Sequence, residues 1–176
     1  TTISDVLEDE INEDRERRNE KNYIEASNHT KALHYGAIQL NQNNFNHTLI
    51  KELHKIMLNN IVEKNKEKTL GKYKEKDNYI VNSVGTIVFN PPSFNETKKY
   101  MDELLDFMND STIDINPLIK TAIIHSQFES IHPFEDGNGR VGRLLISLCL
   151  YKFGVIRFPF FYISEAISQD KSIYYN

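Results

Sequence analysis

A twelve-residue stretch before an apolar helix constrains the fold of this chain more than any other feature. It reads His-Pro-Phe-Glu-Asp-Gly-Asn-Gly-Arg-Val-Gly-Arg from residue 132 to residue 143 and continues into the apolar residues 144–146. Its glycines allow successive backbone N–H groups to turn towards one anion. A helix that begins near Asn138 or Gly139 adds unpaired N–H groups and the positive end of its dipole at the same place. The stretch therefore predicts a phosphate site at the start of a buried helix.

The side chains of this stretch suit phosphate chemistry. Arg140 and Arg143 are three positions apart, so we expect them on one side of the first helical turn, where they can bind anionic oxygens together. Asp136 is placed to hold Mg²⁺, which binds through one or two carboxylates together with substrate phosphates. His132 can act as a general base, because the ordinary pKa of an imidazole is about 6.5. We expect Phe134, in contrast, to anchor the loop in the core.

Other interpretations of the glycine pattern are weaker. Gly137, Gly139 and Gly142 match the dinucleotide fingerprint, but that motif needs a preceding strand, and residues 117–131 have helical periodicity. An EF-hand loop fails because its fifth and twelfth positions hold arginine and serine. The sequence contains neither a P-loop motif nor a His-Glu-x-x-His pair, so we expect neither a P-loop NTPase nor a zinc site.

The bulk properties indicate one soluble domain. The chain has 176 residues, which is enough for a real core, and its formal charge of −4 argues against general nucleic-acid binding. No signal peptide is visible and no apolar run approaches the ~20 residues of a membrane span, so we expect a cytoplasmic protein without a membrane partner. The single cysteine, Cys149, excludes a disulfide framework, and its helical spacing from Leu145 and Leu148 predicts a buried structural thiol.

The pattern of apolar residues predicts an all-α fold with one β element. We expect a single domain over residues 1–176, with N-terminal helices in 1–64, a β flap in 79–92, core motif helices in 112–153 and a C-terminal helix in 163–176 that continues beyond the end of the chain. Within the N-terminal part, residues 2–20 predict a helix that either has a solvated end or leads into a charged loop, and residues 23–40 predict a helical face interrupted by Gly36. Residues 64–76 predict a lysine-rich loop.

Short signals predict where several elements begin and end. Ser93 with Glu96 three positions later is typical of a capping box, and Asn116 followed by Pro117 is typical of a helix start. Gly154 is expected to end the motif helix near residue 153.

The stretch from residue 132 to residue 143 resembles the signature of the Fic family, His-x-Phe-x-Asp/Glu-Gly-Asn-Gly-Arg-x-x-Arg, at every fixed position. The resemblance extends upstream through residues 125–131 and downstream to Tyr174 and Tyr175. Fic proteins transfer AMP from ATP to a hydroxyl group of a target protein and release pyrophosphate. The resemblance therefore implies a mainly α-helical Fic fold with a small β-hairpin flap, and protein adenylyltransferase activity.

Carried onto this sequence, the resemblance assigns a role to each matching position. It implies that His132 deprotonates a Ser, Thr or Tyr hydroxyl and that Asp136 holds Mg²⁺ on the α- and β-phosphates of ATP. Independently of the resemblance, His125 and Glu129 lie four apart on the expected preceding helix, and we expect them to support the site more readily than to take part in catalysis. The implied phosphate-binding residues are Gly137, Asn138, Gly139, Arg140, Val141, Gly142 and Arg143, the last of which would reach the γ-phosphate. The implied flap residues, which could dock an extended target segment as an added strand, are Val84, Gly85, Thr86 and Ile87. Tyr174 and Tyr175 would border the adenine pocket.

Several alternatives stay open at this point. The chain could use another donor, remove AMP, or act as a nucleotide-binding regulatory module. The expected partners are ATP and an unidentified target protein, with self-modification and a homodimer both open. Many relatives carry an inhibitory helix with Ser/Thr-x-x-x-Glu-Gly/Asn, whose glutamate pairs with the second motif arginine. Residues 4–9 depart from that pattern at its last position, so we expect such a helix upstream of Thr1.

Overall fold

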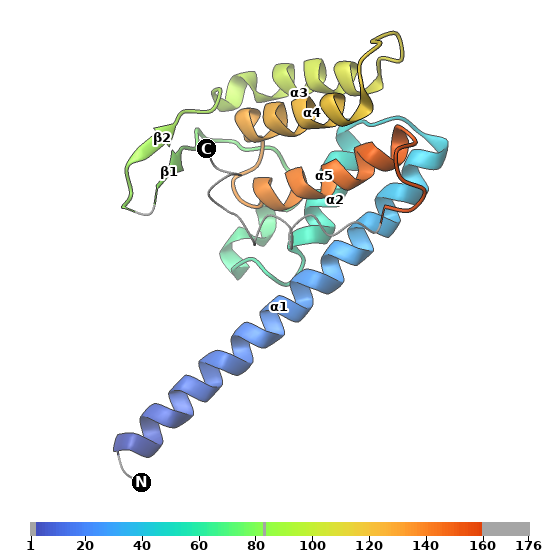
Figure 1. Ribbon diagram of the computed structural model, residues 1–176. Coiled ribbons are helices and arrows are strands. Elements are labelled where there is room, and N and C mark those ends of the chain that lie inside the picture. The colour runs from blue at the N-terminus through green and yellow to red at the C-terminus, as the bar shows by residue number, and fades with distance from the viewer. Residues whose placement is uncertain (1–2, 83, 160–176) are drawn as a thin grey trace.

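The expected all-α fold with one small β-hairpin is confirmed (Figure 1). A computed structural model describes residues 3–82 and 84–159, with side chains from residue 20 onwards except that of Asn65. Its elements are α1 (Ile3–Gln42), α2 (His47–Leu58), a 3₁₀ helix (Lys64–Thr69), β1 (Ile80–Val81), β2 (Ile87–Phe89), α3 (Phe94–Asn109), α4 (Pro117–Ile131) and α5 (Asn138–Lys152). The predicted C-terminal helix in 163–176, with Tyr174 and Tyr175, lies outside the described residues. None of the described helices is long and apolar enough to cross a membrane.

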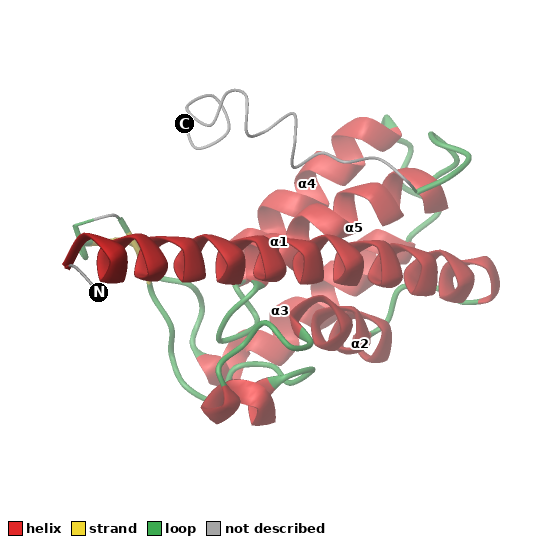
Figure 2. Cartoon of the chain, turned by 90° about the horizontal axis from the view of Figure 1, so that it is seen from below, coloured by secondary structure: helices red, strands yellow, loops and turns green. Residues whose placement is uncertain are grey.

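Of the two structures expected for the charged part of residues 2–20, a solvated helix end or a loop, the structure has the helix. α1 is one unbroken helix of 40 residues, whose first part projects away from the body of the molecule (Figures 1 and 2). Glutamate, lysine and arginine, which dominate this region, are all good helix formers, and no proline or glycine interrupts it before Gly36. Gly36 lies within the helix. A Cβ at this position would come 2.6 Å from Cδ1 of Leu148 on α5, so the position has no room for a side chain. This glycine lets α1 and α5 cross closely.

The core lies between the five helices and surrounds α5. Most residues of α5 are buried, and it packs between α4 on one side and α1 on the other (Figure 1). Cys149 is fully buried in this helix, and burial raises the pKa of its thiol, so the predicted structural thiol is confirmed. Because α5 is held on both faces, its first turn is fixed relative to the rest of the molecule.

The helix-start signals are mostly confirmed. Asn116 caps α4 by accepting a hydrogen bond from the Leu118 amide at 2.8 Å. Ser93 is the N-cap residue of α3, but its hydroxyl donates to the Glu96 carboxylate at 2.7 Å and accepts no backbone amide. The Phe94 amide instead donates to Oδ1 of Asp77 at 2.8 Å, so the cap of α3 comes from the segment that precedes the hairpin.

The β element is an antiparallel hairpin in which Ile80 pairs with Phe89 and Val81 with Ile87. Its turn is held by Asn82, whose Oδ1 accepts the amides of Val84 and Thr86 at 3.1 and 2.9 Å. The hairpin extends from the body beside the ends of α3 and α4 (Figure 1). The predicted lysine-rich loop before it contains the short 3₁₀ helix.

Candidate functional site

His132 lies where α4 ends and the motif loop, residues 132–137, begins. Its amide donates to the Phe128 carbonyl at 3.0 Å and closes the helix. Its backbone is left-handed, with φ 49° and ψ 59°, which is uncommon for a residue with a side chain. The imidazole lines a cavity of about 550 Å³ together with Gly139 at the start of α5 and with Ile80 and Phe89 of the hairpin. The loop therefore brings the predicted base and the predicted phosphate site to one cavity.

The contacts of His132 define which ring nitrogen carries its proton. Nδ1 lies 3.3 Å from the carbonyl oxygen of Glu129, and a carbonyl only accepts, so Nδ1 is the protonated nitrogen of the neutral ring. Burial lowers the pKa of His132, the bond to the Glu129 carbonyl raises it and the charge of Lys74 lowers it, with a lowered pKa as the result. The ring is therefore neutral at neutral pH, and none of the residues that the structure describes forms a hydrogen bond with its Nε2 lone pair.

Phe134 and Asn138 hold the motif loop in shape. Phe134 is fully buried, which confirms the expectation that it anchors the loop in the core. Asn138 closes the loop, because its Oδ1 accepts the Phe134 amide at 2.9 Å and its Nδ2 donates to the Phe134 carbonyl at 2.8 Å. Both polar atoms of the Asn138 side chain are thus engaged within the protein, so this side chain holds the loop.

His54 on α2 contacts two residues of the motif loop, Phe134 and Asp136. Its ring stacks on that of Phe134 with 3.9 Å between centroids and 13° between planes. Nδ1 accepts the Gly71 amide at 3.0 Å, so Nε2 carries the proton and donates to the Asp136 carbonyl at 3.0 Å. Burial lowers the pKa of His54 to about 4. This neutral imidazole connects α2, the segment after the 3₁₀ helix and the motif loop.

The start of α5 presents backbone N–H groups that no carbonyl of the helix accepts. Gly137 precedes it with a left-handed φ of 79°, and a Cβ there would come within 2.6 Å of Cδ1 of buried Leu58, so only glycine fits. The first intrahelical bond runs from the Val141 amide to the Gly137 carbonyl at 3.1 Å. The amides of residues 138–140 have no acceptor inside an α-helix and lie at the positive end of its dipole. The predicted anion site rests on these three amides, whereas the Val141 amide is bonded and its side chain is buried.

Arg140 is shared between two carboxylates. Its guanidinium lies 3.3 Å from Oε1 of Glu25 on α1 and 3.3 Å from Oδ1 of Asp136. Asp136 Oδ1 also accepts the Gly137 amide at 2.6 Å, so this carboxylate and this arginine are held beside the helix start.

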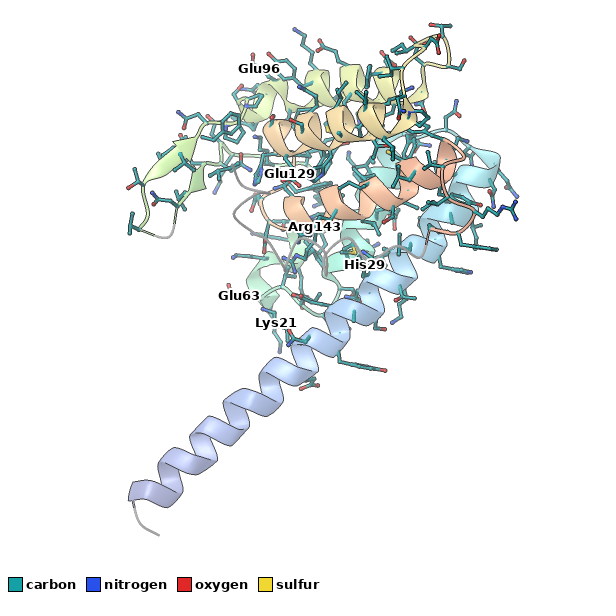
Figure 3. All side chains as sticks on the ribbon, in the orientation of Figure 1. Lys21, His29, Glu63, Glu96, Glu129 and Arg143 are labelled. Carbon is teal, nitrogen blue, oxygen red and sulfur yellow. The ribbon has the colours of Figure 1, made fainter. Side chains whose placement is uncertain are left out.

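Arg143 lies on the same side as Arg140, as the spacing predicts. Both line a cavity of about 280 Å³ together with Glu25 and His29 of α1. In Figure 3, Arg143 and His29 lie between α5 and α1. A Cβ on Gly139 would come 3.2 Å from a terminal nitrogen of Arg143, so this guanidinium reaches back to the helix start. The two guanidiniums share one cavity, and it differs from the one that His132 lines.

Glu129 and His125 of α4 line the cavity of His132. Figure 3 shows Glu129 between α4 and α5. A Cβ on Gly142 would overlap Oε1 of Glu129 and come 3.2 Å from Cε1 of His125. Gly142 therefore makes room for these side chains. Burial raises the pKa of Glu129, although the charge of Arg143 opposes the shift. Burial also lowers the pKa of His125.

Asp136 is the residue in this site that suits a magnesium ion. Its side chain is half exposed and Oδ1 holds two donors, so Oδ2 is the oxygen available to a cation. Among the residues that the structure describes, no group of three or more His, Cys, Asp or Glu side chains gathers as a metal site. One carboxylate fits Mg²⁺ that arrives with a nucleotide and completes its shell with phosphates and water.

The predicted flap residues form the outer part of the hairpin. Val84 and Ile87 are exposed, and so are Gly85 and Thr86. Ile80 and Phe89, nearer the body, face the cavity of His132. The hairpin therefore covers the site with one part and presents exposed apolar side chains with another.

Comparison with known proteins agrees with this geometry. The model of the Fic/DOC family matches residues 44–150, which include α2, the hairpin, the motif loop and most of α5. The chain belongs to the Fic/DOC family. The His132 loop and the start of α5 lie within the matched residues.

Two relatives illustrate the similarity and its extent. The chain is 39% identical over 67 residues to the protein adenylyltransferase fic-1 of Caenorhabditis elegans, which is 38% of this chain and 13% of the relative. It is 38% identical over 73 residues to a probable protein adenylyltransferase of Aquifex aeolicus, which is 41% of this chain and 22% of the relative. The chain therefore matches less than a quarter of the length of these relatives.

A solved structure shares the fold. The crystal structure of a Fic domain containing signaling protein from Bacteroides thetaiotaomicron is 30% identical in sequence, with a TM-score of 0.64 over 76% of this chain and 50% of that one.

Several residues that shape the site of this Fic domain were not predicted from the sequence. Three residues from distant segments bond to the motif loop: His54, Lys74 and Asn78. A fourth, Glu25, contacts Arg140. The sequence carries a weak signal for two of them. Lys74 and Asn78 are four positions apart and lie directly before the hairpin. Lys74 belongs to the lysine-rich segment 64–76, in which the sequence predicts only exposed lysines.

Proposed function

We propose that this Fic domain is a protein adenylyltransferase that transfers AMP from ATP to a Ser, Thr or Tyr hydroxyl of a target protein. The observation that carries the proposal is that His132, neutral and with a free Nε2, lines the same cavity as Gly139 at the donor-rich start of α5. The relatives named protein adenylyltransferase support it at the level of the family.

In this proposal the triphosphate binds at the start of α5. The amides of residues 138–140 and the guanidinium of Arg140 contact the phosphates nearest the cavity of His132, and Arg143 contacts the γ-phosphate. The target hydroxyl oxygen attacks the α-phosphorus, the bond from that phosphorus to the bridging oxygen breaks, and pyrophosphate leaves. Such transfers depend mainly on positioning and on neutralising charge, which matches a site made of backbone amides and arginines.

His132 receives the proton of the attacking hydroxyl on Nε2. A general base typically contributes 10²–10⁴-fold, and it works only in its neutral form. The lowered pKa of His132 supports this role, since the ring stays neutral at the pH of a cell. Mg²⁺ held by Asp136 would neutralise charge on the phosphates when the nucleotide is bound.

The target protein is proposed to dock on the hairpin. The strand β2 is short and its residues Ile87, Val88 and Phe89 are exposed, so an extended segment can pair with its backbone. Pairing there would bring a hydroxyl on that segment towards the cavity below. We place adenine binding with Tyr174 and Tyr175 on the sequence resemblance alone.

Labelled ATP separates the proposed reaction from its alternatives. The protein is incubated with Mg²⁺, a cell lysate and ATP that carries the label on either the α- or the γ-phosphate. We expect protein-bound label from the α position only, and its loss in His132→Ala. Label from the γ position would indicate phosphoryl transfer instead, and retained ATP binding without any labelled protein would indicate a regulatory module.

A further inference from the structure

Lys74 lies at the base of the hairpin and is almost completely buried, with 3% of its surface exposed. Its ammonium group donates to Oδ1 of Asn78 at 2.8 Å, to the Pro92 carbonyl at 2.8 Å and to the Ile131 carbonyl at 3.4 Å. An ammonium has three donors, and these three acceptors match them one to one. All three acceptors are uncharged, so the ammonium group is held by oxygen dipoles.

The same lysine connects three separate segments. Ile131 is the last residue of α4, and Pro92 follows β2 on the return arm of the hairpin. The backbone amide of Lys74 also donates to the Pro133 carbonyl at 2.8 Å. A positive charge at the C-terminal end of α4 is favourable, because it faces the negative end of the helix dipole.

Asn78 binds two further carbonyls of the same stretch of backbone. Its Nδ2 donates to the His132 carbonyl at 3.2 Å and to the Phe134 carbonyl at 2.9 Å. The contact from the Lys74 ammonium to Oδ1 turns the amide so that its nitrogen faces these two carbonyls. Lys74 and Asn78 together therefore bind the four consecutive carbonyls of residues 131–134.

These contacts surround the strained residue of the site. A left-handed backbone such as that of His132 persists only where the surrounding structure holds it. The carbonyls before, at and after His132 are the groups that Lys74 and Asn78 bind. Both residues also belong to the segment that leads into β1, so one pair of side chains fixes the hairpin and the histidine to each other.

We propose that Lys74 and Asn78 form a positioning unit that holds His132 in its left-handed conformation and sets the hairpin above it. The catalytic consequence rests on the proposed function, whereas the structural consequence does not. A misplacement of about 1 Å can cost about 10²-fold in rate, so loss of this unit is expected to lower kcat by about that factor. ATP affinity should stay unchanged, because the proposed triphosphate contacts come from residues 137–143.

Lys74 also has an electrostatic effect that Asn78 lacks. Its charge lowers the pKa of His132, so removal of the charge should raise that pKa and move the acid limb of the pH–rate profile to higher pH. Asp77 lies near Lys74, and His125 and Glu129 line the cavity of His132. Every variant keeps the titratable residues Asp77, His125 and Glu129, and the charged motif residues Glu135, Asp136 and Arg140.

The test compares Lys74→Met and Asn78→Ala with Lys76→Met, a control at an exposed lysine of the same segment. Hydrogen exchange reports on the hairpin amides, and NMR titration reports the pKa of His132. We expect both site variants to speed exchange of the hairpin amides by about tenfold and to lower kcat, while the control does neither. Only Lys74→Met should raise the pKa of His132, since Asn78→Ala keeps the charge.

The outcomes separate this proposal from the proposed function. If the wild-type protein transfers no AMP, the enzymatic role fails, but exchange and titration still test the positioning unit. If Lys74→Met does not fold, Asn78→Ala carries the test through exchange and kcat. Hairpin exchange and kcat like those of the wild type in folded Asn78→Ala would overturn the proposal. An unchanged His132 pKa in folded Lys74→Met would overturn only the electrostatic effect of the lysine.

Discussion

His54 and His132 are both neutral imidazoles, but they use their nitrogens in different ways. His54 is 2% exposed and engages both nitrogens with backbone groups, so it has no capacity left for chemistry. His132 engages Nδ1 with a carbonyl and keeps Nε2 free beside a cavity. His54 thus holds the motif loop in place, whereas His132 has a nitrogen that can take part in a reaction.

The stability of the folded protein should depend on pH through His54. The pKa of His54 is about 4 in the folded protein and about 6.5 in an unfolded chain, so the unfolded state binds this proton more readily. The stability from neutral His54 is present above about pH 6.5 and is lost as pH falls towards 4, by up to about 3 kcal/mol. His54→Gln should therefore flatten the dependence of the free energy of unfolding on pH in this window.

Urea unfolding at several pH values checks this prediction. His34→Gln, at an exposed histidine of α1, is the control for loss of an imidazole. A slope in His54→Gln as steep as that in the control would show that another group titrates with folding.

At the scale of residues, the sequence predicts the residues of the motif better than the residues that hold the motif loop in place. His132, Asp136, Arg140 and the motif glycines lie within twelve consecutive residues, so one local pattern contains all the residues expected to do the chemistry. His54 bonds to a residue 82 positions away, a contact that exists only in the folded chain. Asn138 was expected among the phosphate-binding residues. Its side chain instead holds the motif loop through two hydrogen bonds to the backbone of Phe134.

At the scale of elements, α1 and α5 meet over the two motif arginines. Glu25 of α1 lies 3.3 Å from Arg140, and Arg143 lines the same cavity. A triphosphate that binds these arginines must compete with the carboxylate of Glu25 for Arg140. The helix that covers the arginines therefore also opposes the binding of an anion there.

Glu25→Gln should accordingly tighten the binding of Mg²⁺–ATP. Because both side chains are partly exposed, we expect a modest gain of about two- to fivefold, largest at low ionic strength. Isothermal titration calorimetry at two salt concentrations measures it, with Glu20→Gln on the same helix as the control. Weaker binding in Glu25→Gln would instead show that Glu25 holds Arg140 in its binding position.

The sequence predicts elements well where their signals are local. Asn116 and Gly154 mark helix ends through contacts within a few residues, and both positions are confirmed. The continuity of α1 through its charged region was one of two possibilities, because charged residues favour both solvated helix and loop. Its crossing of α5 at Gly36 depends on Leu148, far away in the sequence.

At the scale of the whole molecule, the start of α5 lies between two cavities. One contains His132 and lies under the hairpin, and the other contains both arginines and lies against α1. This arrangement suits a substrate that is gripped on one side of the helix start and attacked on the other. The order of elements places the two covering parts, α1 and the hairpin, on separate sides of α5 (Figure 1).

The central claim is that His132 removes a proton from a hydroxyl while the start of α5 holds the triphosphate. Intact-mass analysis of the protein after incubation with ATP and Mg²⁺, alone and with candidate target proteins, tests it most directly. We predict a gain of one AMP unit on a target or on the protein itself with the wild type, and none with folded His132→Ala that still binds ATP. An equal gain with His132→Ala would contradict the account.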